Sequence, residues 1–129
     1  MREPKWLIPE AVVAVHQMLI AAHGGLPGVR DASLLESALY RPQQLIAYGD
    51  DYTFPGLAAG YCFGLARNHP FVDGNKRMAL TASAMFLELN GYTLDASEAD
   101  AVVVLEQLAA GKITEEDLTA WFAANTKTK

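Results

Sequence analysis

Apolar residues recur at intervals of three and four along most of the chain, which is the spacing of amphipathic helices. The first such stripe runs from Val12 to Ile20 and follows Pro9, a residue that suits a first helical turn. Gly24 and Gly25 end this helix. Five further stripes predict helices that begin near residues 32, 55, 75, 98 and 115. The pattern therefore predicts an all-α fold of about six helices in a single domain over residues 1–129.

The second predicted helix has two candidate caps and a proline that limits its length. Ser33 begins a capping-box pattern, and Asp31 is a competing cap. We expect the helix to stop before Pro42, because a residue that precedes proline disfavours helical dihedral angles. Residues 43–48 could then form an extended segment, followed by a turn at 49–51.

Three glycines lie on one face of the third predicted helix. Gly56, Gly60 and Gly64 are spaced four residues apart. Each lowers helix propensity by about 1 kcal/mol relative to alanine. We expect close approach of another helix along this face to compensate for that loss.

Capping patterns also mark the last two predicted helices. Ser97 with Asp100 and Thr114 with Asp117 have the spacing of helix N-terminal caps. Residues 92–94 are predicted to form a short extended piece, and residues 126–129 are expected to fray.

The composition narrows the class of ligand. The chain has 51% hydrophobic residues, which excludes general disorder, and a formal net charge of -5. An acidic chain is a poor candidate for nonspecific nucleic-acid binding, so we expect no direct binding to DNA. Three of the ten cationic residues nevertheless fall within residues 67–77. A local positive site on an acidic protein favours a small anion over a long polyanion.

Cysteine usage and hydropathy predict the compartment. Cys62 is the only cysteine, so no intrachain disulfide can form, and its apolar surroundings predict a buried, inert thiol. Residues 1–5 lack the apolar stretch of a signal peptide. No apolar run approaches the roughly 20 residues of a membrane span. We therefore expect a cytoplasmic protein without a membrane partner.

Residues 69–77, with the sequence HPFVDGNKR, carry the chemistry that most needs an explanation. A helix is predicted to begin at Gly74–Asn75, and its first amides with the helix dipole favour a phosphate. Gly74 lets the backbone approach a ligand, and Asn75 can donate an amide hydrogen to a phosphate oxygen. Lys76 and Arg77 can flank the same anion from two sides.

Two further residues of this segment suit catalysis. Asp73 supplies a hard oxygen for Mg²⁺ held between one carboxylate and phosphate oxygens. His69 can accept a hydroxyl proton at neutral pH. Together they meet the needs of phosphoryl or nucleotidyl transfer. Each residue alone would be unremarkable, and His16 and His23 are interpreted as a core residue and a helix-end residue.

The segment resembles the HxFx(D/E)(G/A)N(G/K)R signature of the Fic/Doc superfamily. Lys76, where most Fic adenylyltransferases have glycine, resembles the death-on-curing (Doc) toxin branch. Leu80 stands where those adenylyltransferases have a second arginine, which counts against adenylyl transfer. The similarity extends to residues 24–42 and to residues 90–92, so it covers nearly the whole chain.

The resemblance implies a role for each residue of the segment. His69 would be the general base, and Asp73 would hold Mg²⁺ and help to orient the histidine. Asn75, Lys76 and Arg77 would bind the phosphates of ATP, with backbone amides from Gly74 and its neighbours. Arg67 could join them. Residues 43–53 would take the place of the family's flap, which binds a target segment by strand-like pairing.

The resemblance also implies an activity and partners. Toxins of this branch are kinases that phosphorylate a threonine of a translation factor, elongation factor Tu, and an antitoxin restrains them through its C-terminal segment. This chain lacks the inhibitory motif (S/T)xxxE(G/N), so restraint by a separate antitoxin is expected. Two alternatives stay open. One is a protein adenylyltransferase or other nucleotidyl transferase, and the other is a module that binds a nucleotide without transfer.

Overall fold

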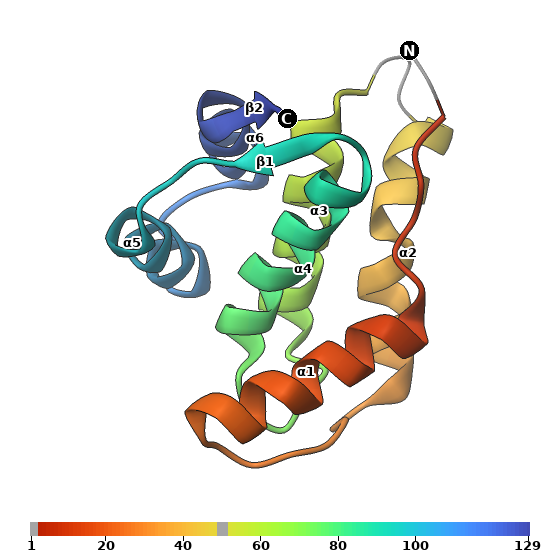
Figure 1. Cartoon of the computed structure of the whole chain (residues 1–129), viewed down its shortest axis with the longest axis vertical. Helices are drawn as coiled ribbons and strands as arrows, with labels where there is room; N and C mark the ends of the chain where they lie inside the picture. The colour runs from red at the N-terminus through yellow and green to blue at the C-terminus, as the bar shows by residue number, and fades with distance from the viewer. Residues whose placement is uncertain (1–2, 49–51) are drawn as a thin grey trace.

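Helix α3 (Phe54–Asn68) lies at the centre of the fold in the computed structural model, which describes residues 3–48 and 52–129 (Figure 1). It packs against α2 (Ala32–Tyr48), α4 (Asn75–Leu89) and α6 (Glu115–Asn125). Ten of the fifteen residues of α3 are buried, which is unusual for a helix with a solvent-facing side. The hydrophobic core is therefore organised around α3.

The remaining elements surround the ends of α3 and α4. Helix α1 (Pro9–His23) crosses near the α3–α4 connection, and α5 (Glu98–Ala109) lies on the other side of α4 in Figure 1. Strands β1 (Tyr92–Leu94) and β2 (Thr126–Thr128) form a two-stranded antiparallel sheet. Within the described residues, the predicted all-α fold of about six helices is confirmed, and the two paired strands are separated in the chain by α5 and α6. None of the described helices is long and apolar enough to cross a membrane.

The helix starts agree with the capping patterns of the sequence. Ser97 accepts a hydrogen bond from the amide of Asp100, and Thr114 forms a complete capping box with Asp117. For α2 the competing cap is the one used, because Asp31 Oδ1 accepts from the amide of Leu34 at 3.0 Å. Side-chain oxygens thus bind amides that have no partner inside each helix.

Helix α2 continues through Pro42, so both the predicted stop and the extended segment over 43–48 are wrong. The packing of α3 explains why the proline is tolerated. A Cβ on Gly64 would lie only 3.1 Å from Cα of Ala38, and one on Gly60 would lie 3.5 Å from Cγ of Pro42. The glycine face lets the two helices approach closely, as predicted, and this packing offsets the roughly 3 kcal/mol cost of an interior proline. The predicted turn at 49–51 lies outside the described residues.

The position of the expected flap is also wrong. Residues 43–48 are helical, and 52–53 lead into α3. Helix α3 begins at Phe54, at the opposite end from the α3–α4 loop (Figure 1). A helix of 15 residues is about 22 Å long, which is too far for strand-like pairing beside the loop.

The C-terminal residues form a strand and do not fray. Strand β2 pairs with β1 in the register Tyr92 with Thr128 and Leu94 with Thr126. An ion pair of 2.6 Å between Lys127 and Asp95 accompanies the pairing. The predicted fraying is wrong because β1 would otherwise expose an unpaired edge of backbone donors and acceptors.

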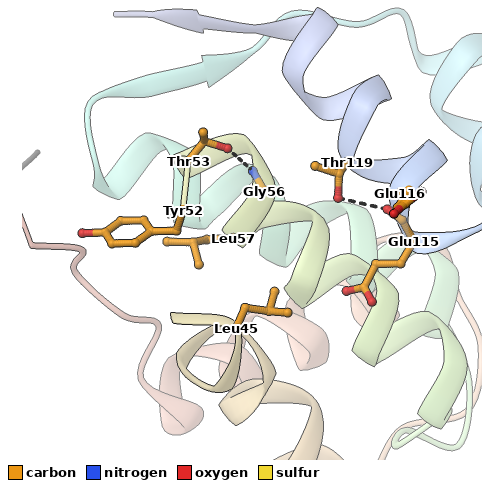
Figure 2. Close-up of a pocket in the computed structure, with 8 residues that line it drawn as sticks. All are labelled: Leu45, Tyr52, Thr53, Gly56, Leu57, Glu115, Glu116 and Thr119. Atoms are coloured by element: carbon orange, nitrogen blue, oxygen red, sulfur yellow. Dashed lines mark hydrogen bonds between the residues drawn. The ribbon is translucent and has the colours of Figure 1, made fainter. Parts of the chain in front are cut away.

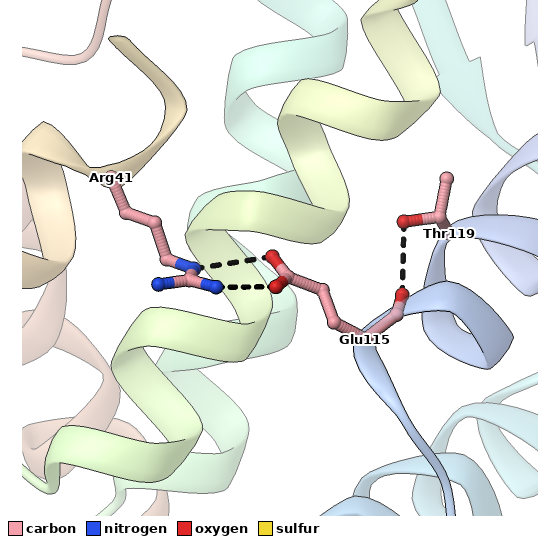
Figure 3. Close-up of polar contacts among 3 residues, drawn as sticks. All are labelled: Arg41, Glu115 and Thr119. Atoms are coloured by element: carbon pink, nitrogen blue, oxygen red, sulfur yellow. Dashed lines mark hydrogen bonds and ion pairs between the residues drawn. The ribbon is translucent and has the colours of Figure 1, made fainter. Parts of the chain in front are cut away.

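An ion pair joins α2 to α6 across the middle of α3 (Figure 3). Arg41 Nε donates to Glu115 Oε2 at 3.1 Å, and its Nη2 donates to the other carboxylate oxygen. The arginine also lies over the ring of Phe63, 4.7 Å from the ring centre. A bidentate pair fixes the plane of the guanidinium relative to the plane of the carboxylate. It therefore ties α6 to α2.

Candidate active site at the α3–α4 loop

The loop between α3 and α4 begins and ends with a residue in the left-handed conformation. His69 ends α3 with φ 48° and ψ 56°, and Gly74 precedes α4 with φ 75° and ψ 20°. Glycine adopts this conformation freely, whereas a histidine does so at a cost of about 1–2 kcal/mol. The chain thus reverses direction within six residues and leaves the exposed His69 beside the first turn of α4.

The segment that precedes α2 pairs with the loop. Val29 and Phe71 form an isolated antiparallel bridge. The amide of Arg30 donates to the carbonyl of Pro70 at 2.7 Å, and the amide of Val72 donates to the carbonyl of Gly28 at 3.0 Å. The segment 28–30 therefore takes the place beside the loop that the sequence analysis gave to residues 43–53.

Phe71 and His16 attach the loop to the core. The Phe71 ring is buried and stacks on the imidazole of His16 with ring centres 3.8 Å apart. His16 Nε2 lies 2.8 Å from the carbonyl oxygen of Asp73. Because a carbonyl oxygen only accepts, Nε2 must carry the hydrogen. The interpretation of His16 as a core residue is confirmed, and the structure adds a direct contact with the loop.

The amide of Asn75 closes the loop on itself. Its Oδ1 accepts from the Phe71 amide at 3.0 Å, and its Nδ2 donates to the Phe71 carbonyl at 3.0 Å. This reciprocal pair satisfies both backbone groups of a buried residue, which would otherwise cost about 1–3 kcal/mol each. The side chain to which the sequence analysis assigned phosphate binding thus fixes the loop, and one of its two amide hydrogens remains for a ligand.

Asp73 is exposed and held in place by two backbone amides. Oδ1 accepts from Gly74 at 2.9 Å, and Oδ2 accepts from Leu26 at 3.1 Å. Gly25 has a φ of 112°, which favours glycine, and a Cβ there would lie 2.8 Å from Asp73 Oδ2. Carboxylate oxygens have further lone pairs, so this oriented carboxylate can still bind a cation.

A cavity of about 820 Å³ gathers most of the predicted residues. His69 and the loop residues 72–77 line one side of it, and Leu19 and His23 of α1 line another. The opposite wall comes from α5 and the residues before it, among them Ser97, Val102 and Glu106. Of the seven predicted site residues the cavity brings together six, namely His69, Asp73, Gly74, Asn75, Lys76 and Arg77.

Arg67 is the predicted residue that does not line this cavity. Its guanidinium lies over the ring of Phe63, 5.4 Å from the ring centre. Lys76 and Arg77 are exposed at the first turn of α4, and neither belongs to the three ion pairs formed among the described residues. Both charges therefore remain available to an anion at the helix N-terminus.

The cavity suits a metal that a ligand brings with it. No group of three or more His, Cys, Asp or Glu side chains in the described part of the chain could hold a metal ion by itself. Asp73 alone can supply an oriented carboxylate oxygen, which fits Mg²⁺ because that ion keeps several waters and binds phosphate oxygens. The site fits a magnesium–phosphate complex better than a free ion.

A second cavity of about 430 Å³ lies at the other end of α3 (Figure 2). Its lining includes Leu45, Tyr52 and Leu57 on one side and Glu115 and Glu116 on the other. The lining contains no histidine and no cation, and Glu115 is bound to Arg41. Two carboxylates disfavour a phosphate, so the loop cavity is the candidate site for phosphate binding.

Sequence and geometry at the loop agree with a known family. A model described as the Fic/DOC family matches residues 6–87, and the chain belongs to this family. It is 39% identical over 83 residues to Protein kinase doc of Escherichia phage P1, a match that covers 64% of this chain and 66% of the relative. It is 49% identical over 78 residues to Toxin Doc of Mycolicibacterium smegmatis, with 58% of each chain covered. The chain therefore spans less than two thirds of either relative.

Proposed function

We propose that the chain is the toxin of a toxin–antitoxin pair and transfers the γ-phosphate of Mg-ATP to a serine or threonine hydroxyl of a protein. One observation carries the proposal: His69, Asp73, Lys76 and Arg77 face a single cavity at the N-terminus of α4. Lys76, Leu80 and the name of the phage P1 relative favour phosphoryl over adenylyl transfer.

The proposed reaction divides the residues into a base and a phosphate-binding set. His69 accepts the proton of the target hydroxyl while the hydroxyl oxygen attacks the γ-phosphorus. ADP leaves with the electrons of the broken P–O bond. The first amides of α4 with Lys76 and Arg77 stabilise the charge on the phosphate oxygens. Asp73 would hold Mg²⁺, which neutralises further charge on those oxygens.

The α5 wall supports binding of a whole nucleotide. Ala101, Val102 and Leu105 give this wall an apolar surface, and Leu80 of α4 lies in the same lining. Nucleotide pockets of several hundred Å³ combine an apolar wall for a base with a few polar groups, as this cavity does. The phosphates would lie at the loop and the base toward α5.

The target segment would lie along the outer edge of Val29. In the bridge with Phe71, the bonded groups belong to the flanking residues, so the amide and carbonyl of Val29 point away from the loop. Within the described part of the chain no hydrogen-bond partner occupies that edge. A peptide would be added there by strand addition. Amide exchange of Val29 should slow when the target binds, and an unchanged rate would exclude this placement.

Elongation factor Tu in the cytoplasm is the target that the family resemblance suggests, and a separate antitoxin would restrain the chain. The test uses ATP labelled on the γ- or the α-phosphate with purified translation factors. Label from the γ-phosphate should reach a protein, and His69→Ala should abolish the transfer. Transfer from the α-phosphate would establish a nucleotidyl transferase, the first alternative.

Expression without an antitoxin tests the remaining alternative, a module that binds a nucleotide without transfer. Growth arrest that depends on His69 supports an enzyme, because His69→Ala removes the base and leaves the phosphate-binding residues in place. Equal toxicity of the wild type and His69→Ala would indicate a module that acts by binding alone.

A further inference from the structure

One arginine binds three consecutive carbonyls around His69. Arg30 Nε donates to the carbonyl of His69 at 2.7 Å, and its Nη2 donates to that of Asn68 at 2.9 Å. The backbone amide of the same arginine donates to the carbonyl of Pro70 at 2.7 Å. The peptide groups on both sides of His69 are thus fixed by one residue of the paired segment.

The local sequence explains why this helix end needs an external donor. A helix that ends in a left-handed residue is usually closed by amides of the next residues, which bond back to its last carbonyls. Here the next residue is Pro70, which has no N–H. Arg30 places a positive charge and two donors at the C-terminal carbonyls of α3, where the helix dipole favours a cation.

His69 is also the only non-glycine residue with positive φ in the described part of the chain. Without external bonds, a histidine would relax from this conformation toward negative φ, and its imidazole would turn with the backbone. Arg30 does not line the cavity, so it does not touch a nucleotide held there. Its bonds act on the backbone of His69.

We propose that Arg30 is a positioning residue that holds His69 in the left-handed conformation and thereby aims the imidazole into the cavity. The effect of Arg30 on catalysis rests on the proposed function, whereas its effect on the conformation of His69 rests on geometry alone. A lysine could reach one of the two carbonyls but could not span both, because only the guanidinium carries two donors in a fixed fork.

The kinetic test compares Arg30→Lys and Arg30→Met with the wild type. The turnover number should fall, roughly 10-fold to 100-fold in Arg30→Met and less in Arg30→Lys, because misplacement by about 1 Å can cost 100-fold. The KM for ATP should change less than about twofold, since Lys76, Arg77 and the α4 amides are untouched. Arg41→Met is the matched control: it breaks the ion pair with Glu115 away from the loop and should leave the turnover number unchanged.

A spectroscopic arm separates this inference from the proposed function. The Cα and Hα chemical shifts of His69 report its backbone conformation in the full chain without substrate. They should move in both Arg30 variants and stay in place in Arg41→Met. If the wild type transfers no phosphate, the proposed function fails, and these shifts still decide the role of Arg30. Unchanged His69 shifts, or a raised KM with an unchanged turnover number, would overturn the inference.

Discussion

At the scale of residues, the site divides into side chains that face the cavity and side chains that shape the loop backbone. His69, Lys76 and Arg77 belong to the first group. His16 and Arg30 belong to the second group and donate hydrogen bonds to backbone carbonyls of the loop and of the end of α3. The second group determines where the first group points. Mutations in the two groups should therefore change different kinetic parameters.

Replacing His69 with glycine should stabilise the fold while abolishing transfer. Removal of left-handed strain is worth about 1–2 kcal/mol, and the greater freedom of glycine in the unfolded chain costs about 0.4–1 kcal/mol. The side chain is exposed, so little packing is lost. We expect a net gain of roughly 0.5–1 kcal/mol in urea unfolding. His69→Ala keeps the strain and serves as the control; a glycine variant no more stable than the alanine variant would contradict the strain.

Burial raises the pKa of the Cys62 thiol to about 12, although a hydrogen bond with Ser83 lowers this pKa. An unfolded thiol loses its proton near its ordinary value of 9.0. Stability from the protonated thiol is therefore complete below that pH and is lost as pH rises toward about 12. The unfolding free energy of the wild type should fall more steeply above pH 9 than that of Cys62→Ala. Parallel pH profiles would refute the shift.

The sequence was sufficient to predict the six loop residues that line the cavity, because their types and spacing meet a chemical need, but it did not predict the α5 wall. It was not sufficient for His16 and Arg30, whose loop contacts span 57 and 39 residues of sequence. A histidine on an inward helix face and an arginine before a helix cap carry no local pattern. Arg67 shows the converse: its charge suits phosphate, but its position on α3 places it over Phe63.

At the scale of elements, local rules located most helix starts and failed where tertiary packing was decisive. The rule that proline ends a helix failed at Pro42, since the contact with Gly60 and Gly64 outweighs the lost bond. The rule that terminal residues fray failed at 126–128, since β1 offers them an edge. Both errors arise from partners that are distant in the sequence.

Gly64→Ala should destabilise the protein although alanine is the better helix former. The intrinsic gain is about 1 kcal/mol, but the new Cβ would meet the backbone of α2, which cannot move without separating the helices, at a cost of about 1–3 kcal/mol. Gly60→Ala is the matched comparison, because its nearest neighbour is the flexible end of Leu45, at 2.9 Å. Thermal unfolding should rank Gly64→Ala as the less stable variant, and the reverse order would show that α2 and α3 are not packed this closely.

At the scale of the whole molecule, the cavity depends on elements far apart in the chain. One wall is the loop with its cations, and the other is α5 with Glu98 and Glu106. The cations of the loop therefore stand on a chain whose net charge is -5. In the proposed function, the loop binds the phosphates and α5 limits the size of the ligand.

Two neighbouring valines on α5 test this arrangement. Val102 and Val103 are 47% and 51% exposed, but only Val102 lines the cavity. Val102→Glu should weaken Mg-ATP binding on the order of fivefold, since one added surface charge is worth about 1 kcal/mol against the phosphates. Val103→Glu adds the same charge outside the cavity and should bind like the wild type. Calorimetric titration measures both, and equal weakening by the two variants would place the nucleotide elsewhere.

The two walls of the cavity are synthesised one after the other. Translation proceeds from the N-terminus at about 5–20 residues per second. The segment 28–30 and the loop emerge first, and the wall of α5 follows some thirty residues after the loop. Helix α6, which adds Leu118 and Phe122 to the core, follows α5. A growing chain thus carries His69, the proposed base, well before the wall that would enclose the proposed nucleotide has been made.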